Sequence, residues 1–157
     1  MIMKHIRNLT NKKIKKLHNL SYIIFFLYCS LMLWEVFIGP YRSYSGLRRY
    51  NLYPFKTIVD FALNTSHYTV EAIFINLAAN IITFIPLGFF IPLLFKNFRK
   101  FKSMILLSIT IILIIELNQF TLNVGVLDID DVILNTLGCI LGFITYNSVK
   151  RICLQNK

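Results

Sequence analysis

Four long apolar segments alternate with shorter polar connections along the chain. They cover residues 20–40, 72–95, 104–122 and 129–149. A helix that rises 1.5 Å per residue needs about 20 apolar residues to cross a hydrocarbon core of about 30 Å. The pattern therefore predicts an all-α, polytopic membrane helix bundle with about four transmembrane helices.

The connections and the second segment carry further structural signals. Residues 41–70 mix charged and turn-forming residues and predict a long loop. The basic run 96–102 and the acidic run 123–128 predict short turns. Pro86 and Pro92 each lack a backbone donor, so they predict a kink or break in the second half of the second helix.

The composition agrees with a membrane protein. Of the 157 residues, 56% are hydrophobic and only 15% are charged, against about 25% charged residues in soluble domains. Nothing in the chain resembles a linker between folded units. We therefore predict a basic cytoplasmic N-terminus (1–19), one membrane domain (20–150) and a cytoplasmic C-terminal tail (151–157).

The distribution of basic residues predicts the orientation. Thirteen of the 17 lysines and arginines lie near the termini or in the 96–102 turn, and four lie in residues 41–70. By the positive-inside rule, both termini are cytoplasmic (N-in and C-in), and residues 41–70 and 123–128 lie outside. A net charge of +10 then reflects topology and lipid contact, and it does not indicate a nucleic-acid partner. The basic lead also suits a signal peptide, but no cleavage site follows, which favours a retained anchor.

The cysteines and histidines do not form a recognisable site. Cys29, Cys139 and Cys153 lack metal-ligand or redox spacing, and the three histidines stand far apart. The sequence therefore predicts no metal site, identifies no cofactor and leaves any catalytic residue unknown.

Polar residues recur on one face of several predicted helices. Glu116 lies about 20 Å into the third helix, at a depth where an acid normally faces protein or a water-filled cavity. Gln119, three residues later, shares its face. Asn76 and Asn80 share a face of the second helix.

The fourth segment carries a matching stripe, formed by Asp128, Asp131, Asn135, Gly138 and Gly142. Gly138 and Gly142 form a small-xxx-small pattern, which predicts close helix packing. With Glu35 at a similar depth, four helices are predicted to surround one polar pocket that opens outward. The predicted pocket residues are Asn76, Asn80, Glu116, Gln119, Asp128, Asp131 and Asn135.

Structural roles are open for the same residues. Asp128, Asp130 and Asp131 could cap the fourth helix, and the asparagines could join helices as packing contacts. Glu35 could extend toward the membrane interface. The basic residues of the first outer loop could bind lipid phosphates or the outer carboxylates. These basic residues are Arg42, Arg48, Arg49 and Lys56.

Four motifs follow one another in an order that resembles the VanZ-like family over roughly residues 20–150. They are Asn51-Leu-Tyr-Pro-Phe-Lys-Thr-Ile58, Asn80-Ile-Ile-Thr-Phe-Ile-Pro-Leu-Gly-Phe89, Glu116 with Gln119, and Asp128-Ile-Asp-Asp-Val-Ile-Leu-Asn-Thr-Leu-Gly138. The polar motif positions are Asn51 and all the predicted pocket residues except Asn76. The remaining motif positions are Pro54, Phe55, Phe84, Pro86, Gly88, Thr136 and Gly138.

The resemblance implies a multi-pass protein of the bacterial cytoplasmic membrane. The family's namesake raises tolerance to teicoplanin by an unestablished mechanism, so a contribution to glycopeptide tolerance at the cell envelope is expected. The implied partners are membrane lipids and a cell-wall precursor or glycopeptide antibiotic. Family members often carry an arginine before the acidic motif, where this chain has Val124-Gly-Val-Leu127. The charge partner is therefore lost or comes from the first outer loop.

Two other function classes are open. Glu116 and Asp131 could serve an intramembrane enzyme that acts on a lipid-linked or headgroup substrate. No nucleophile motif or phosphate loop accompanies them, which favours a protein that is not an enzyme. A small transporter subunit is the further alternative, and it would require an oligomer because the chain has no duplicated half. The oligomeric state is open.

Overall fold

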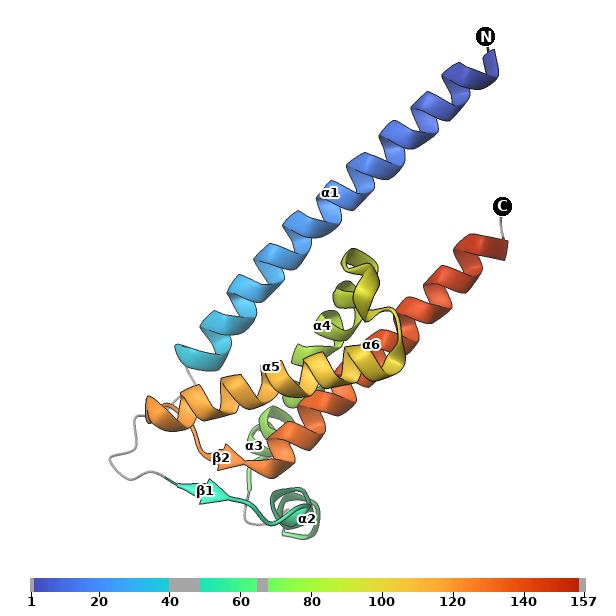
Figure 1. Ribbon diagram of the computed structural model, residues 1–157. Coiled ribbons are helices and arrows are strands. Elements are labelled where there is room, and N and C mark those ends of the chain that lie inside the picture. The colour runs from blue at the N-terminus through green and yellow to red at the C-terminus, as the bar shows by residue number, and fades with distance from the viewer. Residues whose placement is uncertain (1, 40–48, 65–67, 156–157) are drawn as a thin grey trace.

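The computed structural model describes residues 2–39, 49–64 and 68–155, and helices dominate this part of the chain (Figure 1). In chain order the elements are α1 (Ile2–Phe37), β1 (Tyr50–Asn51), α2 (Lys56–Leu63), α3 (Val70–Ile73), the π-helix η2 (Phe74–Ala79), α4 (Asn80–Leu94), the 3₁₀-helix η3 (Lys96–Phe98), α5 (Phe101–Thr121), β2 (Leu127–Asp128) and α6 (Ile129–Gln155).

Four helical stretches in the described residues are long and apolar enough to cross a membrane. They cover Lys15–Phe37, Val70–Leu94, Phe101–Thr121 and Ile129–Cys153. The predicted all-α, multi-pass membrane bundle is therefore confirmed. The first helix differs in extent, because α1 begins at Ile2 and includes the basic lead.

Of the kink or break predicted for the second span, the break is wrong. α4 runs without interruption from Asn80 to Leu94 and contains both Pro86 and Pro92. The irregular part lies earlier, where η2 forms a π-helix between α3 and α4. A break within the hydrocarbon region would expose further backbone groups to lipid, so losing the donors of two prolines costs less than interrupting the helix.

The prediction of a loop for residues 41–70 is wrong for much of the part that the structure describes. This part contains β1 and α2. α2 is a short helix with Phe61 buried. β1 pairs in parallel with β2, which lies in the predicted 123–128 turn, so that Tyr50 faces Leu127 and Asn51 faces Asp128. Charged residues interrupt the apolar ones in this segment, so the sequence shows no clear helical or strand periodicity there. The loop residues Arg42 and Arg48 lie outside the described residues.

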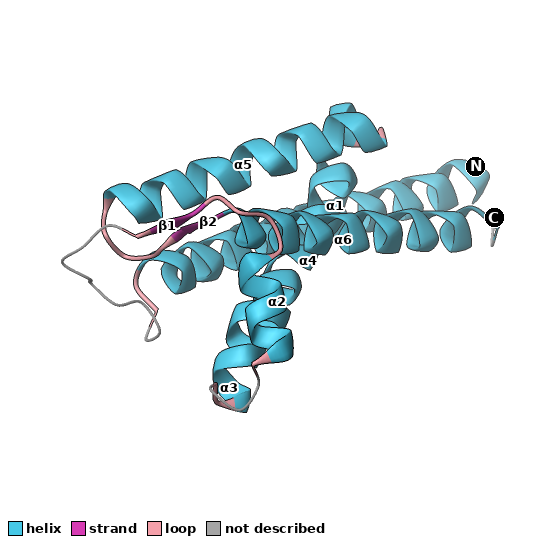
Figure 2. Cartoon of the chain, turned by 90° about the horizontal axis from the view of Figure 1, so that it is seen from below, coloured by secondary structure: helices cyan, strands magenta, loops and turns pink. Residues whose placement is uncertain are grey.

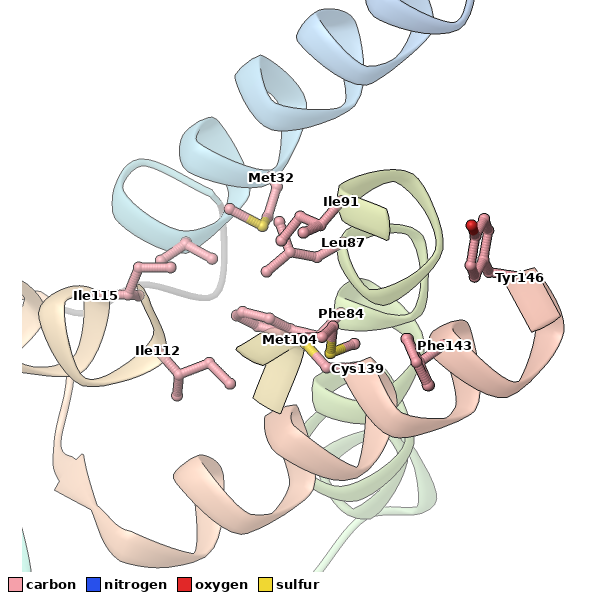
Figure 3. Packing of buried hydrophobic residues seen from close by; sticks show 11 residues of the cluster. Met32, Phe84, Leu87, Ile91, Met104, Ile112, Ile115, Cys139, Phe143 and Tyr146 are labelled. Atoms are coloured by element: carbon pink, nitrogen blue, oxygen red, sulfur yellow. The ribbon is translucent and has the colours of Figure 1, made fainter. Parts of the chain in front are cut away.

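The core lies where α1, α4, α5 and α6 meet (Figure 3). Met32 of α1, Leu87 of α4, Ile112 of α5 and Cys139 of α6 all belong to this buried cluster. Most of the apolar surface of α1 remains exposed; Phe26, for example, is 71% exposed. Such a surface suits contact with lipid chains, which is expected of a membrane-spanning helix.

Three glycines bring α4 and α6 into direct backbone contact. A Cβ atom added at Gly142 would lie 2.0 Å from the carbonyl oxygen of Ile85, and one added at Gly138 would lie 2.2 Å from that of Ile81. From the opposite helix, a Cβ at Gly88 would lie 2.0 Å from the carbonyl oxygen of Cys139. Close helix approach of this kind requires small residues.

The two ends of the bundle differ in composition. Figure 1 shows the N-terminal end of α1, the C-terminal end of α6 and η3 toward one end, where the basic clusters lie. The β pair, α2 and α3 lie at the opposite end and face the viewer in Figure 2. The acidic motif at the start of α6 also lies at this opposite end.

Candidate functional site

A polar cavity of about 460 Å³ lies between the helices and touches residues of α1, α3, η2, α4, α5 and α6. We call it the inner cavity. It collects all the predicted pocket residues except Asp128, together with Glu35 and Glu71. The predicted residues in its lining are Asn76, Asn80, Glu116, Gln119, Asp131 and Asn135.

The asparagines of the second span are held by the helix that carries them. The Asn76 side-chain amide donates to the carbonyl of Ala72 (2.8 Å), and the Asn80 amide donates to the carbonyl of Asn76 (2.9 Å). Asn80 also donates to Asp131 Oδ1, which joins α4 to α6. These bonds lie where the backbone changes from π-helix to α-helix, a feature often found at functional sites.

The polar pair of α5 is buried. Glu116 is 3% exposed and Gln119 is 4% exposed, although both lie in an apolar helix. Gln119 Nε2 donates to the carbonyl oxygen of Val36 (2.9 Å), so it joins α5 to the end of α1. Their shared face, predicted from the spacing of three residues, points into the inner cavity.

Asp128 lies outside the inner cavity and fastens the segment from Asn51 to Thr57 to the start of α6. Its Oδ1 accepts bonds from the Asp130 backbone N–H (2.9 Å) and from Asn51 Nδ2 (3.1 Å). Its Oδ2 accepts a bond from the hydroxyl of Thr57 (2.6 Å). Asp128 therefore combines the helix-capping role with binding of a segment far away in the sequence.

Asp130 has a role that its place at the start of the fourth span does not predict. It is fully buried, and its carboxylate accepts bonds from the backbone N–H groups of Phe55 (2.5 Å), Thr57 (2.8 Å) and Ile58 (3.1 Å). These donors surround the start of α2, whose own N-cap residue, Phe55, provides no side-chain bond. Asp130 thus caps α2 from the other end of the chain, complementing the free amides and the positive end of the helix dipole. The missing local cap is a signal that could have indicated a distant partner.

Most of the other family-motif positions serve packing or line a cavity. Phe84 is buried in the core, and Gly88 and Gly138 form the contact between α4 and α6. Pro54 and Phe55 line the second cavity. Pro86 lies within α4, and Thr136 lies within α6 beside Asn135.

The second cavity, which we call the outer cavity, measures about 910 Å³ and adjoins the inner one. Asn76 and Asp131 line both cavities. The outer cavity also carries Arg49 and Lys56 beside acidic residues. Arg49 lines this cavity together with Val124, Gly125 and Val126.

Asp60 in the outer cavity has its own partners. It accepts bonds from Asn64 Nδ2 (2.7 Å) and from the hydroxyl of Tyr68. The bond to this carboxylate raises the pKa of Tyr68 above its ordinary value. Within the described ranges, no group of three or more histidine, cysteine or acidic side chains has the geometry to hold a metal ion.

Comparisons with known proteins agree with the motifs. The family model described as VanZ/LLP1 matches residues 20–151. The chain is similar to Protein VanZ of Enterococcus faecium, with 34% identity over 99 residues that cover 61% of this chain. The match spans 59% of the length of that relative. No solved structure matches the chain.

Proposed function

Because this chain belongs to the VanZ/LLP1 family, we propose that it raises tolerance to teicoplanin-type glycopeptides from the bacterial cytoplasmic membrane. The observation that supports this proposal is the convergence of Asn80, Glu116 and Asp131, from three different motifs, on the inner cavity. In the proposed role, this cavity binds a component of the cell envelope and thereby changes the exposure of antibiotic targets.

The orientation that we propose places both termini in the cytoplasm and the two cavities on the outer side. The gathering of the basic clusters at one end of the bundle supports it (Figure 1). The acidic residues belong to the opposite part of the structure, where Glu71 and Asp131 line the inner cavity. This arrangement exposes the polar site to the cell-wall side of the membrane.

A binding role is favoured over acid–base catalysis by the surroundings of Asp131. Its carboxylate is engaged by the Asn80 amide, and the inner cavity contains neither a histidine nor a cysteine among its described lining residues. A general acid or base needs a reacting partner within hydrogen-bond reach. A neutral amide that donates to Asp131 suits positioning better than proton transfer.

Teicoplanin susceptibility of a sensitive host tests the proposed function. Expression of the wild-type chain is expected to raise the inhibitory concentration. Glu116→Gln and Asp131→Asn, at matched membrane levels, are expected to return it to that of the host alone, because each removes a carboxylate from the inner cavity. Asp60→Asn is the matched control, because it makes the same change of charge in the outer cavity only. No rise with the wild-type chain would exclude the tolerance role, and unchanged tolerance in both variants would assign these residues to packing.

A further inference from the structure

Side-chain carboxamides from three of the membrane spans meet in the inner cavity. Asn76 and Asn80 belong to the second span, Gln119 belongs to α5 and Asn135 belongs to α6. A carboxamide combines two N–H donors with a carbonyl acceptor and carries no charge. The cavity is therefore lined from several directions by neutral groups that donate and accept hydrogen bonds.

The charges around the inner cavity do not indicate a charged ligand. Its four acidic residues are Glu35, Glu71, Glu116 and Asp131, and each of them has an interaction partner within the protein. Their carboxylates therefore do not require a cation from outside. The described lining contains no lysine, arginine or histidine, so an anion would meet no positively charged side chain there. A neutral polar ligand fits this lining best.

Two of the carboxamides keep a donor for such a ligand. Asn76 Nδ2 and Gln119 Nε2 each donate one bond to a backbone carbonyl oxygen (2.8 and 2.9 Å). Each of these nitrogens carries a second N–H group. The Asn80 nitrogen, in contrast, donates to both the Asn76 carbonyl and Asp131. The lining can therefore donate to a ligand as well as accept from it.

Asn135 supplies an independent sign of a missing donor. Its side chain lines the inner cavity, and the residue is only 3% exposed. Its Oδ1 atom is buried and has no hydrogen-bond partner within the described part of the chain. A buried acceptor without a partner is costly, and such an atom in a native cavity indicates that a donor group is bound there.

We propose that the inner cavity binds the hydroxyl groups of a sugar or a similar polyhydroxyl group. A hydroxyl donates one hydrogen bond and accepts up to two, so neighbouring hydroxyls serve the Asn135 oxygen and the second N–H groups of Asn76 and Gln119 together. An ether only accepts and an ammonium only donates, so neither serves both kinds of group. The volume of about 460 Å³ admits a group of this size. This inference rests on the proposed function, since it names the ligand class of the same cavity.

Binding to the full chain in phosphatidylcholine nanodiscs tests this inference, because the phosphatidylcholine headgroup has no hydroxyl or N–H group. The probe is octyl glucoside, and octyl tetraethylene glycol ether and octylammonium are comparison compounds with the same apolar chain. Octyl glucoside is expected to bind about tenfold or more tightly than either comparison compound. Equal binding of the ether or tighter binding of octylammonium would overturn the inference. No binding of the glucoside would also overturn it and leave water as the partner of Asn135.

Free glucose distinguishes two sources of the same hydroxyl chemistry. Competition by glucose at concentrations similar to those of octyl glucoside would support a soluble sugar as the ligand. Competition only at much higher concentrations would support the sugar headgroup of a lipid.

Two variants locate the site. Asn135→Leu removes the unpartnered oxygen, and Asn76→Leu removes a donor whose side-chain bond goes to the helix backbone one turn earlier. Each is expected to weaken octyl glucoside binding about tenfold. Asn64→Leu, which removes an amide from the outer cavity only, is expected to leave it unchanged. If Asn135→Leu does not fold, Asn76→Leu decides. An equal loss in Asn64→Leu would overturn the assignment to the inner cavity.

Binding and tolerance are measured separately, so the two proposals can fail separately. Selective glucoside binding by a protein that confers no teicoplanin tolerance would uphold the hydroxyl site and exclude the proposed function. Tolerance without selective binding would uphold the function and overturn the hydroxyl site.

Discussion

Asp130→Asn is expected to release α2 from α6 and to lower the free energy of unfolding by about 3 kcal/mol. The two carboxylate oxygens of Asp130 accept bonds from three backbone donors, those of Phe55, Thr57 and Ile58. An asparagine has the same size but only one acceptor oxygen, and its NH₂ group would face at least one backbone N–H. Because Asp130 is fully buried, water cannot replace the lost acceptor.

Thermal unfolding in detergent and hydrogen exchange at the amides of Phe55, Thr57 and Ile58 measure this effect. Faster exchange at these amides, with the four long helices retained, is the expected local result. Asp60→Asn is the control, since Asp60 makes side-chain bonds to Asn64 and Tyr68 in the same region. Unchanged amide exchange in Asp130→Asn would show that the carboxylate does not hold α2 in solution.

Gly142→Ala is expected to force α4 and α6 apart and to destabilise the bundle by about 1–3 kcal/mol. The new methyl group would lie 2.0 Å from the carbonyl oxygen of Ile85, and that oxygen belongs to rigid helical backbone. In an exposed helix the same substitution would stabilise by up to about 1 kcal/mol, because alanine is the better helix former. The predicted change in the free energy of unfolding therefore has the opposite sign to the change expected from helix propensity.

Unfolding of the purified protein in mixed detergent micelles provides the measurement. Ser148→Thr, which adds one methyl group on the exposed side of α6, is expected to have little effect. Gly88→Ala should resemble Gly142→Ala, because Gly88 makes the reciprocal contact with Cys139. Combining the two variants should cost less than the sum of the separate effects, because one separation of the helices relieves both clashes. Stabilisation by Gly142→Ala would contradict the close backbone contact.

The sequence predicted the membrane spans because length and apolar composition suffice for that purpose. Helical periodicity also indicated which polar side chains share a face, so residues such as Asn80, Glu116 and Asn135 could be assigned to one pocket before their positions were known. Asp128 departs from this pattern. It continues the stripe of α6, but it lies in β2 just before that helix begins, where the pairing of β1 with β2 gives it other partners.

Other features could not be predicted because their causes lie far away in the sequence. α2 has no local cap, and the carboxylate of Asp130, more than 70 residues later, provides one. β1 and β2 have two residues each and carry no periodic signal of their own. The π-helix η2 has a sequence that would also suit an ordinary α-helix, and the prolines drew attention to a later part of the same span.

The parallel pairing of β1 with β2 also affects the biosynthesis of the protein. Asn51 leaves the ribosome 77 residues before its partner Asp128, a delay of roughly 4–15 s at 5–20 residues per second. During this delay β1 and α2 cannot form their contacts with β2 and the start of α6. The first span is already available for insertion into the membrane. Both cavities depend on Asp131, so they are completed only after the last span emerges. A nascent chain that stalls before α6 would therefore contain inserted helices but would lack Asp131 and with it part of the wall of both cavities.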